Sequence, residues 1–214
     1  MAETGAQLTA TVCTGTIIPA MTSATAPSGV VSASGALDAN RAAWMAFDRT
    51  NPAGSATGTW TTAGTTGWLQ YQFPAAHVIT SYAVTSRNYA SPRAPKTWTF
   101  KGSNNGTTWT TLDTQTNITD WAATANVRKV FDCANTTAYA YYRLDITASN
   151  DADYVGVGEL EMMKYSGLHV IADGADTANP AESLNAVTYT IGDRVQVTLR
   201  TPRMPLVTGT VTTA

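Results

Sequence analysis

The chain has 214 residues and a formal charge of −2; 43% of its residues are hydrophobic and only 13% are charged. This apolar content is enough for a folded core and excludes a wholly disordered chain. No basic block marks a nucleic-acid interface. No apolar run reaches the ~18 residues of a membrane-spanning helix. We therefore expect no nucleic-acid partner and no membrane insertion.

The opening sequence, MAETGAQLTATVCTGT, has no basic segment followed by an apolar one. We therefore expect no signal peptide and synthesis in a cytoplasm, wherever the protein acts later. Cys13 and Cys133 are too few and too far apart for a zinc site. We expect free buried thiols, with a disulfide as the alternative if the protein acts outside a cell.

The one helical pattern lies in residues 36–48, ALDANRAAWMAFD. Asp38 or Asn40 can cap the first turn, and apolar residues recur at i, i+3 and i+4 spacing on one face. We predict a short helix here.

Short strands separated by turns follow. In residues 68–73, WLQYQF, we expect Leu69, Tyr71 and Phe73 to face the core. In residues 140–148, AYYRLDITA, the same alternation buries Tyr142, Leu144 and Ile146 and leaves Arg143 and Asp145 on the other side. Further predicted strands are VITSYAVTSR (78–87), VRKVFD (127–132) and VGVGELEMM (155–163).

Residues 96–112, KTWTFKGSNNGTTWTTL, predict a β-hairpin. Trp98 and Phe100 alternate with polar residues, so both are expected in the core. Asn and Gly in residues 103–106 tolerate the left-handed backbone of tight turns. Many short strands with regular turns and little helix predict an all-β sandwich or barrel.

The order of these pieces resembles the discoidin family, also called the coagulation-factor type C domain, and its galactose-binding-like carbohydrate-binding relatives. The matching stretches are SASG (32–35), AFD (46–48), TW (59–60), GWLQYQF (67–73), VITSYAV (78–84), TWTFKGSNNGTTWTTL (97–112), YYRLDI (141–146) and GVGELEM (156–162). The resemblance implies a jelly-roll β-sandwich with a ligand site on the loops at one end.

The predicted organisation has three parts: an N-terminal arm over residues 1–29, the discoidin-like sandwich over 30–164, and a small β-rich extension over 165–214. The extension has too few apolar residues for its own core. We expect it to contain a hairpin turning at Gly192-Asp193 and to dock on the sandwich or on a neighbouring subunit.

The resemblance implies a structural Ca²⁺ ion held by Asp48, Thr59 and Glu159, whose oxygen ligands suit calcium. The alternative is that Asp48 caps a turn and Glu159 pairs with Arg143. The family usually has glycine after this aspartate, whereas this chain has Arg49 and a longer following loop.

The resemblance also places a sugar-binding loop at residues 87–93 and a second loop near residue 150. Arg, Asn and Asp can bind adjacent hydroxyls, and a tyrosine can pack against the sugar ring. The alternative is ordinary loop polarity. The candidate ligand residues are Arg87, Asn88, Tyr89, Arg93, Asn150, Asp153 and Tyr154.

The tryptophans Trp60, Trp68, Trp98 and Trp109 are expected to pack in the core or on a sheet. Trp121 is expected either to cover apolar surface or to be an exposed contact residue. His77 and His169 have no catalytic or metal-binding partner at a suitable spacing, so both are expected to be structural.

No enzymatic activity is expected. Asp151, Asp153 and Glu159 could suggest the acid pair of a glycosidase, but a pair works only with one acid held protonated across the scissile bond. We expect these acids on solvated loops, in a fold that resembles binding modules.

The sequence therefore predicts a non-enzymatic carbohydrate-binding-type module. The flanking segments, low charge and absence of an export signal favour a bacteriophage virion protein of a tail or capsid, with glycans and other virion proteins or its own copies as partners. The alternatives are a purely structural assembly protein with a vestigial pocket and a bacterial cell-surface lectin module. Lipid binding is disfavoured because the loops are polar.

Overall fold

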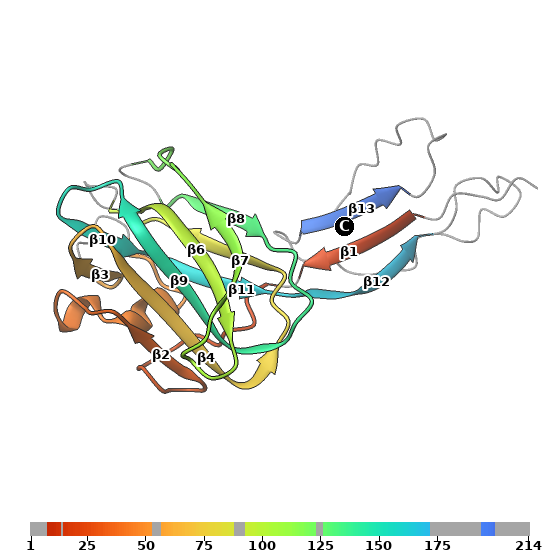
Figure 1. Ribbon diagram of the computed structural model, residues 1–214, viewed down its shortest axis with the longest axis horizontal. Helices are drawn as coiled ribbons and strands as arrows, with labels where there is room; N and C mark the ends of the chain where they lie inside the picture. The colour runs from red at the N-terminus through yellow and green to blue at the C-terminus, as the bar shows by residue number, and fades with distance from the viewer. Residues whose placement is uncertain are drawn as a thin grey trace, which may run out of the picture. The chain divides into compact units, whose positions relative to one another are not determined.

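The computed structural model is predominantly β-sheet (Figure 1). The structure describes residues 8–13, 15–52, 57–87, 93–122, 126–171 and 194–199, with side chains for those between positions 15 and 164. Apart from two short 3-10 helices, the regular elements among these residues are strands, and their pairings are antiparallel. The predicted all-β class is confirmed.

Contacts divide the chain into a sandwich unit, residues 16–164, and a terminal unit, residues 1–15 with 165–214. This boundary differs from the arm predicted over residues 1–29. Ile18 is buried among the core residues of the sandwich unit, so the chain joins the sandwich earlier than its Thr-rich and Ser-rich composition indicates.

The terminal unit contains a three-stranded antiparallel sheet in the order β12-β1-β13. Its strands are β1 (Leu8–Cys13), β12 (Tyr165–Ile171) and β13 (Arg194–Leu199). One strand from the start of the chain therefore lies between two strands from its end. The predicted turn at Gly192-Asp193 lies outside the described residues, and docking of this extension stays a prediction.

The described part of the sandwich unit contains two sheets and a two-stranded ribbon. The larger sheet has the order β2 (Val30–Ala33), β4 (Gly67–His77), β9 (Tyr139–Ser149), β6 (Pro95–Ser103) and β7 (Thr110–Gln115). The smaller sheet has the order β11 (Glu159–Met163), β5 (Ser81–Thr85) and β8 (Arg128–Asp132). The ribbon pairs β3 (Trp60–Ala63) with β10 (Tyr154–Val157).

Alternation along β4 and β9 decides which side chains enter the core. Leu69 and Tyr71 of β4 are fully buried and pair with Leu144 and Tyr142 of β9, which are also fully buried. The intervening Arg143 lies on the opposite face, as the period of two requires. The inward residues predicted for these strands are confirmed.

Aromatic side chains join the two sheets. Tyr82 of β5 stacks on Phe100 of β6 with ring centroids 4.2 Å apart, and Phe131 of β8 packs edge-on against Trp98 at 5.2 Å. The Tyr82 hydroxyl accepts a hydrogen bond from Trp98 Nε1 at 2.8 Å and donates one to Asp113 at 2.6 Å. A hydrogen-bonded chain therefore runs through the aromatic core.

The hairpin predicted over residues 96–112 is confirmed by the pairing of β6 with β7. At its turn, Ser103 Oγ accepts hydrogen bonds from the backbone N–H groups of Asn105 and Gly106 at 3.2 and 3.0 Å. Gly106 has a φ of 72°, the left-handed conformation that glycine adopts without a steric penalty. The hydrogen bonds of Ser103 and the left-handed backbone of Gly106 therefore explain why these residues form the turn.

The segment predicted as one helix forms two separate 3-10 turns. These are η1 (Ala39–Arg41) and η2 (Ala43–Ala46). Asp38 caps the first, since its Oδ1 accepts the backbone N–H of Asn40 at 2.9 Å. Ala42 has extended backbone between the turns, which prevents a continuous helix. Among the described residues, no helix is long and apolar enough to cross a membrane.

Several side chains that were expected to be structural are buried. Trp60 and Trp98 are fully buried, and Trp121 is buried with its Nε1 donating to the Pro95 carbonyl at 3.0 Å. Cys133 is a free buried thiol whose pKa is raised by burial to about 12. The side chains of Cys13 and His169 lie outside the described residues.

We expect Tyr82→Phe to lower the free energy of unfolding by about 2 kcal/mol, because it leaves the buried Trp98 N–H without an acceptor. Denaturant unfolding measures this difference. Tyr139→Phe is the matched control, since the Tyr139 hydroxyl makes no hydrogen bond within the described part of the chain. Equal losses in the two variants would contradict the role of the hydrogen-bonded chain.

Candidate functional site

The structure describes five of the seven predicted sugar-binding residues, because Asn88 and Tyr89 lie outside the described residues. Arg87 is only 1% exposed, so it is buried, whereas the other four are partly or fully exposed. The remaining residues lie around the ends of β9 and β10, beside the start of β6. They are Arg93, Asn150, Asp153 and Tyr154.

Arg93 and Tyr154 lie in contact, although one precedes β6 and the other begins β10. The Arg93 guanidinium carbon is 3.9 Å from the centroid of the Tyr154 ring, a cation–π geometry. The Asp151 carboxylate is 3.9 Å from Arg93 Nε. The Gly156 backbone N–H donates to the Arg93 carbonyl at 2.6 Å, which fixes the two segments against each other.

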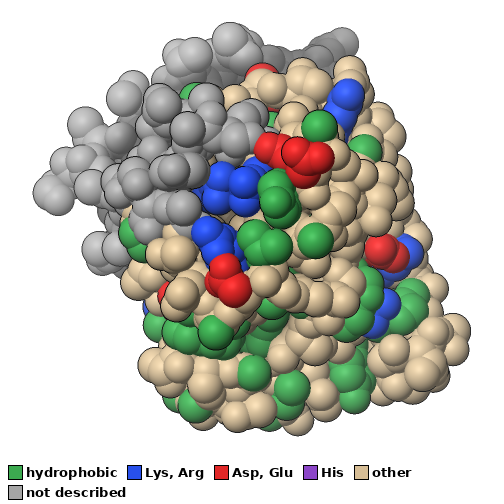
Figure 2. All heavy atoms as spheres, turned by 90° about the vertical axis from the view of Figure 1, so that its left-hand side faces the viewer, with side chains coloured by type: hydrophobic (Ala, Val, Ile, Leu, Met, Phe, Trp, Pro, Cys, Tyr) green, Lys and Arg blue, Asp and Glu red, His purple; other side chains and the backbone are tan. Residues whose placement is uncertain are grey.

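The loop between β9 and β10 is ordered by its own side chains. Asp151 Oδ1 accepts the backbone N–H groups of Asp153 and Tyr154, both at 3.0 Å. Ser149 Oγ donates to the Tyr154 carbonyl at 2.7 Å. Tyr154 is therefore held at a defined position, while the Asp153 side chain is exposed. Figure 2 shows this end of the molecule, where acidic and basic side chains adjoin hydrophobic ones.

Asn150 holds three segments of this end together. Its amide nitrogen lies within hydrogen-bond distance of the carbonyls of Ala94, Pro95 and Ile118, at 3.2, 3.3 and 2.9 Å. Its backbone N–H also donates to the Ala94 carbonyl. The amide is thus bonded to backbone carbonyls, and it fixes the segment that follows Arg93.

A second cluster, made of oxygen atoms, surrounds Glu159 at the start of β11. The Asp48 carboxyl group and the backbone N–H of Arg49 are the nearest polar influences on Glu159. Asp48 also accepts the backbone N–H and the hydroxyl of Thr50, each at 2.7 Å. The predicted turn cap is therefore present, whereas Arg143 bonds elsewhere, to Gln70.

Burial raises the pKa of Glu159 to about 9, and the neighbouring Asp48 carboxylate adds to the rise. The backbone N–H of Arg49 opposes it. Glu159 is only 9% exposed, so its charged form is poorly solvated without a cation. Two adjoining carboxyl groups in this environment favour either a shared proton or a positive ion.

The oxygen cluster fits the donor chemistry of a calcium ion. Thr59 Oγ1 and Glu159 Oε1 are buried and make no hydrogen bond within the described residues, and the same holds for Asn51 Oδ1 and Thr61 Oγ1. No group of three or more His, Cys, Asp or Glu side chains gathers among the described residues. Hydroxyl and amide oxygens would therefore have to complete the shell around Asp48 and Glu159.

Arg49, which follows Asp48, has a left-handed backbone. Its φ is 61°, in the left-handed region that is costly for residues with a side chain. Its guanidinium donates to the Ile18 carbonyl at 2.7 Å. This contact offsets part of the backbone cost and keeps the chain turned beside Asp48.

The outer face of the five-stranded sheet carries a feature that the sequence analysis did not predict. The Arg143 guanidinium carbon lies between two indoles, 4.1 Å from the Trp68 centroid and 4.2 Å from the Trp109 centroid. Both indoles are half-buried and pack on this face instead of in the core. The alternation along the two strands places Trp68 and Arg143 on the same outer face, and this pattern in the sequence could have predicted their contact.

Comparisons with known proteins bear on this geometry. Residues 21–160 match the family model described as the F5/8 type C domain. The fold is similar to that of the F5/8 type C domain of a Bacteroides fragilis protein, with a TM-score of 0.53 and 18% identity over 65% of this chain and 93% of that chain. A search of curated protein sequences finds no match.

Two further similar structures come from Clostridium perfringens. The family 32 carbohydrate-binding module of NanJ, in complex with galactose, has a TM-score of 0.51 and 18% identity over 64% of this chain and 93% of that chain. The module CpGH89CBM32-5, in complex with GalNAc-β-1,3-galactose, has a TM-score of 0.51 and 12% identity over 63% of this chain and 94% of that chain. At these identities the likeness establishes the fold.

Proposed function

Because the chain belongs to the F5/8 type C family, we propose that it is a non-enzymatic protein that binds a galactose-type glycan at the end of its sandwich. The single observation that carries this proposal is the contact of Arg93 with Tyr154 at this end. The glycans in the two Clostridium perfringens structures supply the choice of sugar. The carbohydrate-binding-module fold itself is established by the family match.

The chemistry of the pair suits a sugar. Arginine presents several N–H donors in a fixed plane, which can bind vicinal hydroxyls, and tyrosine adds a ring and a hydroxyl. Asp151 and Asn150 hold this pair in place through the loop backbone. Asn88, Tyr89 and the exposed Asp153 remain predicted ligand residues.

The acid groups support a binding role over hydrolysis. Asp151 is occupied by two backbone N–H groups, and Glu159 is buried against Asp48. A glycosidase needs two carboxyl groups on either side of a bound sugar. Neither acid has that arrangement among the described residues.

We expect Arg93→Ala and Tyr154→Ala each to weaken galactose or lactose binding by about tenfold or more, because each removes a polar or aromatic contact worth ~1.5 kcal/mol. Isothermal titration measures the affinity. Arg128→Ala is the matched control, since Arg128 forms a similar ion pair, with Glu161, on the smaller sheet. Unchanged affinity in both loop variants, or no binding by the native chain, would contradict this site.

We also propose that Asp48, Thr59 and Glu159 hold a structural Ca²⁺ ion, with Asn51 as a further oxygen ligand. The buried oxygens that make no hydrogen bond support it. When bound, the ion would neutralise the two carboxylates, so that Glu159 would be held as the anion. Its role would be to fix the segment after Phe47 beside β11.

Calcium should remove the pH dependence of stability that Glu159 causes. In chelator, the Glu159 pKa rises from 4.5 unfolded to about 9 folded. The free energy of unfolding should therefore fall as pH rises from 4.5 through 9, because only the unfolded chain ionises readily in this range. Added Ca²⁺ should raise Tm and remove this fall, as thermal unfolding would record.

Glu159→Gln should abolish both the calcium response and the fall of stability in chelator. Glu161→Gln is the matched control, because Glu161 lies on the same strand and pairs with Arg128. A native Tm that does not respond to Ca²⁺ at pH 8 would refute the metal site and leave the glycan site untouched.

A second candidate function is structural, as a building block of a larger assembly such as a virion. The observation that favours it is the terminal unit, in which β1 and the two strands from the chain's end form a sheet separate from the sandwich unit. Sedimentation of the full chain should then reveal oligomers that are lost on mutation of this sheet. A monomer at all concentrations would weaken the assembly role.

A further inference from the structure

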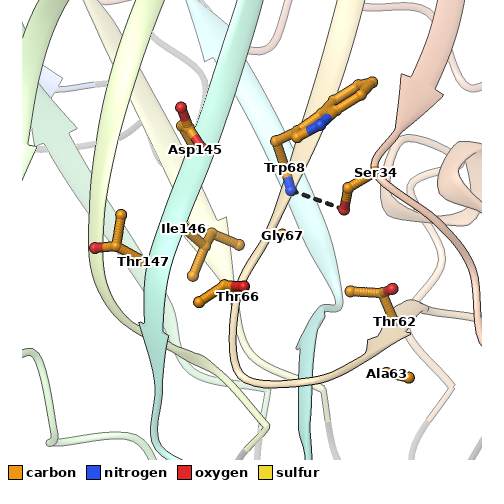
Figure 3. Close-up of a pocket in the computed structure, with 9 residues that line it drawn as sticks. All are labelled: Ser34, Thr62, Ala63, Thr66, Gly67, Trp68, Asp145, Ile146 and Thr147. Carbon is orange, nitrogen blue, oxygen red and sulfur yellow. Dashed lines mark hydrogen bonds between the residues drawn. The ribbon is translucent and has the colours of Figure 1, made fainter.

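A hollow of about 440 Å³ lies where β3, β4 and β9 meet, and none of the predicted sugar-binding residues lines it. Its volume is within the ~300–1,000 Å³ of small-molecule sites. Figure 3 shows Asp145 and Thr147 projecting from β9 on one side, Thr62 on the other and Thr66 between them. The full lining is Ser34, Thr62, Ala63, Thr66, Gly67, Trp68, Asp145, Ile146 and Thr147.

The register of the sheet assembles this lining. Trp68 pairs with Asp145, and both project from the outer face, while Gly67 beside them contributes no side chain. A Cβ on Gly67 would come within 2.8 Å of Ser34 Oγ and 3.0 Å of Thr62 Cγ2. Glycine therefore lets the Ser34 hydroxyl and the Thr62 methyl group lie close to the edge of the sheet.

The hollow has unused capacity to form hydrogen bonds. The Thr62 and Thr66 hydroxyls make none within the described part of the chain. Ser34 Oγ accepts the Trp68 backbone N–H at 3.0 Å and keeps its own proton to donate. Asp145 uses Oδ2 for Lys101 at 2.6 Å, which leaves Oδ1 as an acceptor.

Trp68 supplies a rigid apolar surface beside these polar groups. Arg143 lies against one face of its indole and is itself fixed by two hydrogen bonds to Gln70 Oε1, at 3.2 and 2.8 Å. Because Arg143 is also packed against Trp109, the indole is held without help from a ligand. A fixed indole next to hydroxyls and one carboxylate is suited to a sugar ring, which presents C–H groups on one side and hydroxyls at its edge.

We infer that this hollow is a second binding site, which takes one neutral hexopyranose unit of a glycan. The carboxylate of Asp145 would accept hydrogen bonds from sugar hydroxyls. Lys101 balances its charge, so no cationic ligand is required. The site does not depend on Arg93 or Tyr154, and a chain with both sites would bind glycans bivalently.

The test is titration of the ¹⁵N-labelled full chain with galactose, glucose, mannose and N-acetylglucosamine, read from amide chemical shifts. At least one of these sugars should shift the amides of residues 66–68 and 145–147. Trp68→Ala and Asp145→Asn should each weaken that response by about tenfold or more. Arg128→Ala should leave it unchanged, since Arg128 lies on β8 of the smaller sheet and does not line the hollow.

Tyr154→Ala separates this site from the loop-end site. It should abolish shifts around residues 93 and 154 and preserve those around residues 66–68. A native chain that shows shifts around residues 66–68 but none around residues 93 and 154 would overturn the proposed function and leave the second site intact. Absence of any response at residues 66–68 and 145–147, or its persistence in Trp68→Ala, would overturn the second site.

Discussion

In the pairing of β4 with β9, Leu69 lies opposite Leu144 and Tyr71 opposite Tyr142, and all four side chains are fully buried. A slip of one residue would turn every one of them outward. Burial of each large apolar side chain contributes about 1.5–3 kcal/mol, so the native register is strongly preferred. The aromatic chain through Tyr82 then joins this sheet to the smaller one.

The same register determines the two candidate binding surfaces. It turns Trp68, Arg143 and Asp145 outward, and Trp68 and Asp145 line the hollow. It also brings the end of β9 to the loop in which Asn150 and Asp151 fix Tyr154 beside Arg93. Both surfaces therefore combine residues at β9 of the five-stranded sheet with residues of the β3–β10 ribbon.

Much of this fold followed from the sequence because alternation and turn chemistry are local. The burial of Leu69 and Tyr142 and the turn at Gly106 were predicted from neighbouring residues alone. The helix over residues 36–48 was not, since Ala42 breaks it with an extended backbone that helical periodicity does not reveal. Contact between Arg93 and Tyr154 depends on distant segments, and only the family resemblance suggested that their loops share one end.

The roles of individual polar residues were harder to predict. Asn150 has the chemistry of a sugar ligand, but its amide is taken by backbone carbonyls from two other segments. Arg87 has the same apparent suitability and is buried. The hollow arises from a missing side chain at Gly67, which no residue pattern marks.

Cross-strand nuclear Overhauser contacts in the full chain test the register most directly. Side-chain contacts between Leu69 and Leu144, and between Tyr71 and Tyr142, are the result that the account requires. Contacts of Leu69 with Arg143 or Asp145 in their place would show a slipped strand, and with it neither the core nor the two binding surfaces could have the arrangement described.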